Sequence, residues 1–361
     1  MLLRQYPGMI VLLLALLTGT SARAEQIVLV AGGGTAGDGV PAKQARLQGP
    51  FGIDFDPAGN MFVCELSGGR IHKVDSAGIF TTLGGTTQKG DAGDGGPVAK
   101  ATFNGMHSLA VGPGGDLFIA DTWNNRIRRI STQQGTIAAF AGTGKKKYSG
   151  DGGPAASAEC GGVYCLAFDD GFHKLYLADL DNRRIRVIDM STGKIDLVAG
   201  NGVRGVPTDG SVAKSAPLVD PRAVAVDQAG NVYILERSGH ALRVVDPLGR
   251  IHTVAGTGKA GATGDGGDAR HATLNGPKHL CIDHDQSVLI ADTENHTVRR
   301  YLPKEKKIVR VAGSGKKGTA GLHGPPEKCE LHQPHGVFVH RDGTLYIVDS
   351  GNNRILKIVS E

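Results

Sequence analysis

Short runs of apolar residues recur along the chain and are separated by polar, glycine-rich turns. One unit has an apolar run at 53–55, a turn at 56–60 and a second run at 61–63. A third run carries Arg-Ile, as at 126–127, and a fourth reads Ile-x-x-Val-Ala-Gly, as at 251–256. Short apolar runs bounded by turn residues predict four antiparallel strands in each unit.

The unit repeats at a nearly constant interval. Its start signature recurs after 56, 57, 58, 56 and 57 residues, at Gly49-Pro50-Phe51, Gly105-Met106-His107, Gly162-Val163-Tyr164, Asp220-Pro221-Arg222, Gly276-Pro277-Lys278 and Gln333-Pro334-His335. Repeats of four short strands at a fixed period are typical of propeller blades. The pattern predicts an all-β, six-bladed β-propeller with four-stranded antiparallel blades.

The two ends of this pattern complement each other. The sixth repeat stops at residues 354–358 and lacks a fourth strand, whereas residues 27–32 match the fourth-strand pattern. We therefore expect the N-terminal strand of the mature chain to complete the last blade and close the ring, which leaves no open strand edge.

The first 24 residues have the features of a secretory signal peptide. Arg4 precedes an apolar run at 9–17, and the segment ends in Ala22-Arg23-Ala24. We expect cleavage near Ala24, export to the periplasm or the extracellular space, and a single propeller domain over residues 25–361. Nothing later approaches the roughly 20 apolar residues that a membrane span needs, so no membrane span is expected.

Charge and cysteine content refine this picture. The formal charge of +5 falls to +3 without Arg4 and Arg23, and the remaining charges are interspersed, so no nucleic-acid partner is expected. Five cysteines are an odd number for an oxidising compartment, so at least one should be free or pair between chains. Cys160 and Cys165 are close enough in sequence to bridge, and the repeat register favours a small core residue at Cys64 and at Cys281.

Three segments resemble NHL repeats: residues 119–127, 290–296 and 347–355. The resemblance covers essentially all of residues 25–361. Gly-Asp-Gly-Gly-Pro-Ala insertions such as residues 150–155 are similar to those of exported bacterial members. The family includes protein-binding, RNA-binding and enzymatic propellers, so the resemblance implies the fold and leaves the activity open.

Two sets of side chains should converge at one end of such a propeller, because the links into the first strand and into the third strand emerge there. The first set, here called the mouth ring, follows the start signature and should surround the channel mouth: Phe51, His107, Tyr164, Arg222, Lys278 and His335. The second set is acidic and lies 14 or 15 residues later: Glu65, Asp121, Asp179, Glu236, Asp292 and Asp349.

A side chain that appears in every repeat usually stabilises the fold of the repeat. The four aspartates begin Asp-x-x-Asn turns and should accept bonds from backbone N–H groups two or three residues later. Glu65 and Glu236 instead begin Glu-x-x-Gly in opposite blades, which makes them candidates for a paired ligand-binding role. A further set of aspartates lies 13 residues before the mouth ring: Asp38, Asp94, Asp151, Asp209 and Asp265. We expect them to cap the short Ala-rich segments that follow. The alternative is that each belongs to a calcium-binding loop.

The mouth ring repeats in position and varies in chemistry. Two imidazoles, a guanidinium, an ammonium, a phenol and a phenyl ring are suited to an anionic or hydrogen-bonding ligand, and a solvated entrance is the alternative. This favours a non-catalytic scaffold that binds an unknown small molecule, peptide or protein at the mouth, and no cofactor is predicted.

A catalytic alternative comes from a resemblance to peptidyl-α-hydroxyglycine amidating lyase. In that six-bladed enzyme, three histidines from alternate blades hold zinc at the channel mouth. The matching positions here are His107, Arg222 and His335, so the third ligand would have to come from His240 or Glu236. The resemblance implies a metal-dependent lyase or hydrolase as the second hypothesis.

Overall fold

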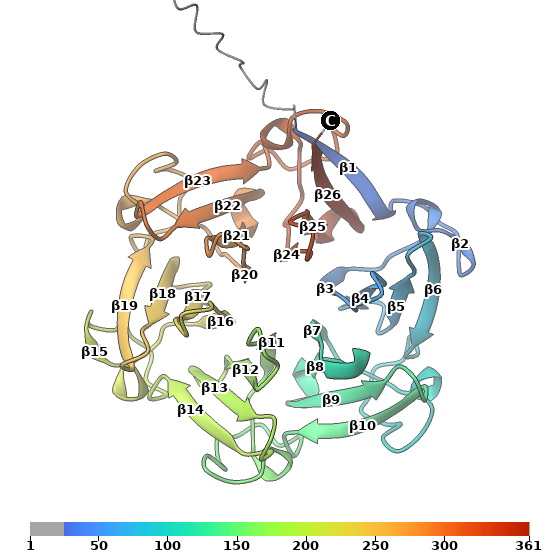
Figure 1. The fold of residues 1–361 in the computed structure, drawn as a ribbon, viewed down its shortest axis with the longest axis horizontal. Coiled ribbons are helices and arrows are strands. Elements are labelled where there is room, and N and C mark those ends of the chain that lie inside the picture. Colours follow the sequence, from blue (N-terminus) through green and yellow to red (C-terminus); the bar gives the residue numbers. More distant parts are fainter. Residues whose placement is uncertain (1–24, 361) are drawn as a thin grey trace, which may run out of the picture.

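The structure is a computed structural model that describes residues 25–360. Six antiparallel sheets surround a central axis, and the innermost strand of each sheet lines the centre of the ring (Figure 1). The all-β, six-bladed propeller is confirmed. The expected signal peptide lies outside the described residues, and none of the helices in the described part is long and apolar enough to cross a membrane.

The strands follow the sequence order from the centre of each blade outward. The first three blades contain β3 (Pro50–Phe55), β4 (Met61–Glu65), β5 (Ile71–Val74) and β6 (Ile79–Gly84), then β7 (Met106–Val111), β8 (Leu117–Asp121), β9 (Arg126–Ser131) and β10 (Thr136–Ala141), then β11 (Val163–Phe168), β12 (Lys174–Asp179), β13 (Arg184–Asp189) and β14 (Ile195–Ala199). We number these blades 1 to 3.

Blades 4 to 6 have the same design. They contain β16 (Pro221–Val226), β17 (Val232–Glu236), β18 (Ala241–Val245) and β19 (Arg250–Ala255), then β20 (His279–Ile282), β21 (Val288–Asp292), β22 (Thr297–Leu302) and β23 (Lys307–Ala312), then β24 (Gly336–Val339), β25 (Leu345–Asp349), β26 (Arg354–Ser360) and β1 (Glu25–Gly32). Short strands from the insertions add to the outer edges of blades 1 and 4, at β2 (Val40–Pro41) and β15 (Ser211–Val212).

Short 3-10 helices occupy the links between strands. Those in the insertions between blades are η1 (Ala42–Gln44), η2 (Val98–Lys100), η5 (Ala155–Ser157), η6 (Ala213–Ser215), η7 (Ala269–His271) and η9 (Pro326–Lys328). The others are η3 (Pro113–Gly115), η4 (Thr122–Asn124), η8 (Thr293–Asn295) and η10 (Ser350–Asn352).

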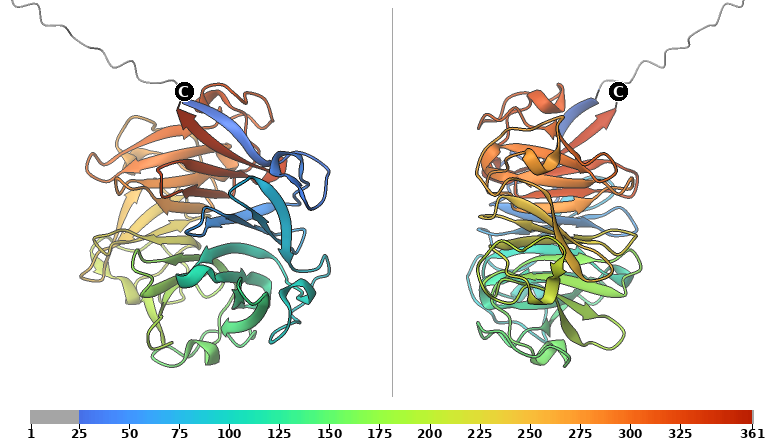
Figure 2. Two further views of the ribbon diagram at one scale, coloured as in Figure 1. Left: turned by 45° about the vertical axis from the view of Figure 1, so that its right-hand side comes forward. Right: turned by 90° about the vertical axis from the view of Figure 1, so that its left-hand side faces the viewer.

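The N-terminal strand closes the ring as expected. β1 pairs antiparallel with β26, with Glu25 opposite Ser360 and Ile27 opposite Ile358. Both strands lie side by side at one edge of the disc, although they come from opposite ends of the chain (Figure 2). Ile27 is fully buried and exchanges backbone hydrogen bonds with His323 and Gly324 in the preceding link. Blade 6 is therefore built from both ends of the chain.

The second strand of each blade carries the densest part of the core. β4, β8, β17, β21 and β25 are buried at every position, because both faces of each sheet pack against neighbouring blades. Ala31, Ala141, Ala199, Ala255 and Ala312 are all fully or almost fully buried at the ends of fourth strands. Close packing at this point explains the small residues of the Val-Ala-Gly signature.

All five cysteines are free thiols in the structure. Cys160 and Cys165 are both buried and are not bridged. Cys64 is a fully buried core residue, as expected. Cys281 is only partly buried and borders a cavity of about 260 Å³ in the central channel, so it is a channel-lining residue.

Candidate binding site at the channel mouth

Four members of the mouth ring form a continuous row of ring contacts. The Phe51 ring centroid lies 5.1 Å from that of His107, and the His107 centroid lies 4.5 Å from that of Tyr164. The Arg222 guanidinium lies over the Tyr164 ring, 4.4 Å from its centroid, which is a cation–π contact. The side chains from blades 1 to 4 thus meet at the mouth, as the repeat register predicts.

The other half of the mouth ring returns to Phe51. Lys278 Nζ lies 3.1 Å from His335 Nε2, and the His335 ring lies 4.1 Å from the Phe51 ring between centroids. One junction is open: among the described residues, no hydrogen bond, ion pair or ring contact joins Arg222 to Lys278. Arg222 and Lys278 are therefore neighbouring cations of the mouth ring that no direct contact joins.

Hydrogen bonds fix the tautomers of the two mouth-ring histidines. His107 Nδ1 lies 2.8 Å from the carbonyl oxygen of Gly105, and His335 Nδ1 lies 2.7 Å from that of Gln333. A carbonyl oxygen can only accept, so Nδ1 carries the proton in each ring and Nε2 presents a lone pair. Burial, reinforced by Arg222 beside His107 and by Lys278 beside His335, holds both pKa values well below the usual range. Both imidazoles are neutral at pH 7.

The cations of the mouth differ in their partners. Lys278 Nζ donates to Glu294 Oε1 at 2.9 Å, and Arg237 Nε donates to Asp220 Oδ2 at 2.8 Å. Arg222 is only 4 % exposed, and no carboxylate of the described residues lies within ion-pair distance of it. Burial, with Arg237 nearby, lowers the pKa of Arg222 to about 10, so its guanidinium remains charged at pH 7.

A second set of side chains surrounds the mouth ring and was missed from the sequence. These residues, here called the outer ring, lie two positions after the recurring acids, and the last of them is a glycine: Ser67, Trp123, Asp181, Ser238, Glu294 and Gly351. Trp123 contacts His107 with 5.6 Å between ring centroids, and Glu294 binds Lys278. The available signal was that this position, like the mouth ring, varies in chemistry while its place in the repeat is constant.

The glycine of the start signature makes room for the outer ring. Gly105 has φ of +69°, and a Cβ placed there would lie 2.3 Å from the Trp123 indole. The positive φ and the covering side chain both exclude a larger residue. The start signature therefore positions the mouth ring and makes room for the outer ring.

A pocket of about 520 Å³ opens on this face between blades 1 and 6. Phe51 and His335 from the mouth ring line its inner side, together with Ser67 from the outer ring. Arg46, which is exposed, and Asn353 also line it. The volume is in the range of small-molecule sites, and His335 links the pocket to Lys278.

The recurring aspartates have a structural role with partners other than the expected ones. Asp121 Oδ1 accepts from the backbone N–H of Asn104 at 2.8 Å, and its Oδ2 accepts from the Asn124 side chain at 2.8 Å. The prediction of bonds to backbone N–H groups just after the acid was wrong, since the backbone donor lies 17 residues earlier. The same pattern holds at Asp179, Asp292 and Asp349.

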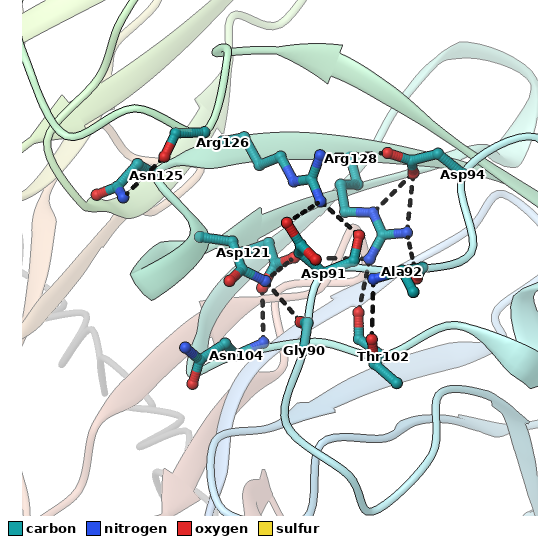
Figure 3. Close-up of polar contacts among 12 residues, drawn as sticks. Gly90, Asp91, Ala92, Asp94, Thr102, Asn104, Asp121, Asn125, Arg126 and Arg128 are labelled. Atoms are coloured by element: carbon teal, nitrogen blue, oxygen red, sulfur yellow. Dashed lines mark hydrogen bonds and ion pairs between the residues drawn. The ribbon is translucent and has the colours of Figure 1, made fainter.

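The insertion aspartates do not cap the 3-10 helices, so that prediction was also wrong. Asp94 instead accepts from Arg128 Nε at 2.9 Å, and Arg128 Nη1 lies 3.6 Å from Asp121 Oδ2 (Figure 3). Arg128 is fully buried and also donates to the carbonyl oxygens of Thr102 and Ala92. This Asp-Arg-Asp clamp recurs at Asp151-Arg186-Asp179 and at Asp265-Arg299-Asp292. In these three blades a buried arginine is the partner of the insertion aspartate, whereas Asp38 accepts from Thr82 and Asp209 from Thr253.

Blade 6 lacks both halves of the clamp. Leu322 replaces the insertion aspartate there, and Leu356 stands where Arg128 stands in blade 2. Asp349 is instead paired with Arg354, whose Nε donates to it at 2.7 Å. Blade 1 keeps its insertion aspartate, Asp38, which accepts from Thr82, although His72 stands at the arginine position.

Glu65 and Glu236 are structural, which corrects their expected ligand-binding role. Both are fully buried. Glu65 accepts from Arg70 Nε at 3.2 Å and lies 3.1 Å from His72 Nε2, and Glu236 accepts from Arg243 Nε at 2.8 Å.

In these two blades, a longer acidic side chain at the first position of Glu-x-x-Gly is matched by the absence of a side chain at the last position. A Cβ at Gly68 would lie 1.8 Å from Glu65 Oε2, and a Cβ at Gly239 would lie 2.8 Å from the Glu236 side chain. The longer glutamate fills the space that asparagine takes in the other blades, so the two departures from Asp-x-x-Asn need no functional explanation.

The histidines of the zinc hypothesis do not form a metal site. His335 Nε2 accepts from Lys278, and His240 Nδ1 accepts from the backbone N–H of Gly276 at 3.2 Å. Arg222 occupies the third position and would repel a cation. No group of three His, Cys, Asp or Glu side chains in residues 25–360 is placed to hold a metal. The donor set of the lyase-like hypothesis therefore does not fit this mouth.

The neutral histidines predict acid sensitivity. Because their folded-state pKa values lie below those of the unfolded chain, unfolding takes up protons below about pH 6.5, and each histidine lowers stability by up to about 1.4 kcal/mol per pH unit. Stability is unaffected above pH 7 and falls towards pH 4. We expect the loss between pH 7.5 and 4.5, measured by urea denaturation, to shrink in a His107→Gln, His335→Gln double variant.

The exposed His271 provides the control for this prediction, because its side chain is 86 % exposed. His271→Gln should leave the loss of stability on acidification as in the unaltered protein. An unaltered loss in the double variant would contradict the assignment of buried neutral imidazoles to the mouth.

Comparisons with protein families match the repeat description. The model of the teneurin NHL domain matches residues 155–263, and that of the NHL repeat matches residues 103–130 and 331–358. Protein SUPPRESSOR OF QUENCHING 1, chloroplastic, from Arabidopsis thaliana is 24% identical over 270 residues, which cover 72% of this chain and 25% of that protein. NHL repeat-containing protein 2 from Bos taurus is 27% identical over 296 residues, covering 73% and 40%. The chain therefore spans less than half the length of these relatives.

Solved structures share the fold at low sequence identity. An auxiliary nutrient binding protein from Bacteroides ovatus superposes with a TM-score of 0.68 at 15% identity, covering 94% of this chain and 77% of that one. A streptogramin B lyase superposes with a TM-score of 0.54 at 13% identity, covering 94% and 98%. Identities this low support the fold and carry no activity across.

Proposed function

This chain is an NHL-repeat β-propeller, and we propose that it is a binding scaffold that holds a ligand or protein partner at its channel mouth. One observation carries the proposal. The residues that recur in the repeat take part in the clamps and turns, whereas the mouth ring brings together six side chains of five different kinds.

The composition of the mouth supports binding. Phe51, His107, Tyr164 and Trp123 give it an aromatic wall, and the neighbouring cations and neutral imidazoles offer donors and acceptors. Ligand sites commonly combine apolar and aromatic walls with a few placed polar groups. Trp123 is 45% exposed, which is unusual for so large an apolar side chain and consistent with a contact surface.

We expect a thermal-shift panel of small ligands to contain compounds that stabilise the protein through the mouth. The panel should cover neutral sugars, amino acids, short peptides, organic acids and neutral amides. A compound bound there raises Tm by mass action, and Tyr164→Ala should remove the shift because it takes away the surface shared by His107 and Arg222. Phe172→Ala, an exposed aromatic outside the mouth and outer rings, is the matched control.

The proposal fails if no compound gives a shift that Tyr164→Ala removes. It also fails if the shifts respond equally to Tyr164→Ala and Phe172→Ala, since the binding would then not depend on the mouth.

A further inference from the structure

The donors of Arg222 lack acceptors. The guanidinium has five N–H groups but makes only one hydrogen bond to the described residues. In it, Nη1 donates to the carbonyl oxygen of Tyr164 at 3.3 Å. Nε is buried without a partner. A buried charge without hydrogen-bonding partners is expensive, so proteins rarely keep one without a use for it.

The other buried arginines of this propeller show the contrast. Arg128, Arg186 and Arg299 are as deeply buried, and each has a carboxylate and backbone carbonyl oxygens around it. Arg243 and Arg354 are also buried and are bonded to Glu236 and Asp349, so the fold supplies acceptors for a buried guanidinium in five blades and omits them at the mouth.

Lys278 is the next cation of the mouth ring and is close enough for Arg222 to act on its charge. Its Nζ has three N–H groups, of which Glu294 and His335 occupy two. The carboxylates near the mouth are already engaged, Glu294 by Lys278 and Asp220 by Arg237. With both histidines neutral, the charges of Arg222, Arg237, Lys278, Glu294 and Asp220 sum to +1, and Arg46 in the adjoining pocket adds a further positive charge. The mouth thus carries more positive than negative charge.

From this geometry we infer that the mouth binds the carboxylate of a small organic acid between Arg222 and Lys278, an inference that rests on the proposed binding function. A planar carboxylate matches the paired donors of a guanidinium. The excess positive charge of the mouth favours an anion. The aromatic wall and the pocket beyond His335 and Phe51 provide a surface for the apolar part of such an acid.

The single tryptophan gives a direct readout. Trp123 is the only tryptophan of the chain and contacts His107. We expect phenylacetate to change its fluorescence saturably, and its neutral isostere phenylacetamide to bind at least about tenfold more weakly, since hydrogen bonds to a charged group are lost. Acetate should also bind more weakly than phenylacetate, because it lacks the apolar group.

Arg222→Met tests the residue itself. We expect the variant to weaken phenylacetate binding at least about tenfold and, without ligand, to unfold at the same or a higher temperature, since it removes an unpaired buried charge. A structural arginine would give the opposite change in Tm. Arg129→Met is the matched control, because Arg129 is paired with Asp116, exposed, and outside the mouth and outer rings; it should change affinity no more than about twofold, as expected for an exposed ion pair.

Four outcomes overturn the inference. Equal binding of phenylacetamide, or equal losses in Arg222→Met and Arg129→Met, would show that no defined carboxylate site exists. If inorganic phosphate binds saturably and phenylacetate does not bind, the site belongs to a phosphate ligand. A lower Tm for Arg222→Met with unchanged affinity would make Arg222 structural. If neutral compounds still bind in a Tyr164-dependent manner in any of these cases, the scaffold function stands and only the carboxylate is wrong.

Discussion

Replacing residues 27–32 with a Gly/Ser segment of equal length should lower Tm by roughly 10 °C or more. The replacement removes the outer strand of blade 6, together with the buried side chains of Ile27 and Ala31. Burial of one large aliphatic side chain is worth about 2 to 5 kcal/mol, and each 1 kcal/mol moves Tm by roughly 2 to 4 °C in chains of 150–250 residues. The loss of backbone hydrogen bonds to β26 adds to this effect.

Glu25→Gln is the control for the closing strand, because Glu25 is exposed at its start and its substitution leaves the strand pairing intact. Differential scanning calorimetry of the three proteins measures the effect. An unchanged Tm after the replacement would mean that β1 does not hold the ring closed.

Arg128→Leu should destabilise the protein by about 3 to 5 kcal/mol, the usual effect of removing one partner of a buried ion pair. Asp121 would lose its cation, Asp94 would keep only Arg126, and the carbonyl oxygens of Thr102 and Ala92 would lose their donor. Urea denaturation measures the loss. Arg129→Leu is the matched control, since this neighbouring arginine is 54% exposed and should change stability by less than about 1 kcal/mol.

Blade 6 supplies the rescue for this prediction. Adding Asp94→Leu to Arg128→Leu reproduces its Leu322 and Leu356 pair. Arg126 then keeps only its contacts with Asp91, and its guanidinium can turn to Asp121 as Arg354 binds Asp349. We expect the double variant to recover at least half of the lost stability. A double variant less stable than Arg128→Leu would show that Arg128 and Asp94 do not act as a pair.

The blade register and the closing strand were predictable from the sequence because both depend on features that repeat. The start signature, the strand pattern and the missing fourth strand of the last repeat are periodic, so each blade confirms the others. The same register placed His107, Arg222 and His335 at one mouth, which the structure bears out through their contacts.

The partners of the buried acids were not predictable from local sequence. Asp94 and Arg128 are 34 residues apart and meet only after the insertion folds back on the next blade. A local turn was the simplest reading of Asp-x-x-Asn, and it was wrong. The joint absence of the pair at Leu322 and Leu356, and the exchange of Asn for Gly beside Glu65 and Glu236, were the signals in the chain that could have revealed these contacts.

The state of Arg222 also needed coordinates. Its position in the register predicts a cation at the mouth and says nothing of its acceptors. The structure shows which carboxylates are already paired, and hence that Arg222 is left without one.

A crystal structure with phenylacetate near its dissociation constant tests most directly whether the mouth holds a carboxylate between Arg222 and Lys278. We expect carboxylate oxygens within hydrogen-bond distance of the Arg222 guanidinium and Lys278 Nζ, with the phenyl group against the aromatic wall. A mouth without phenylacetate, with the compound bound elsewhere or absent, would contradict it.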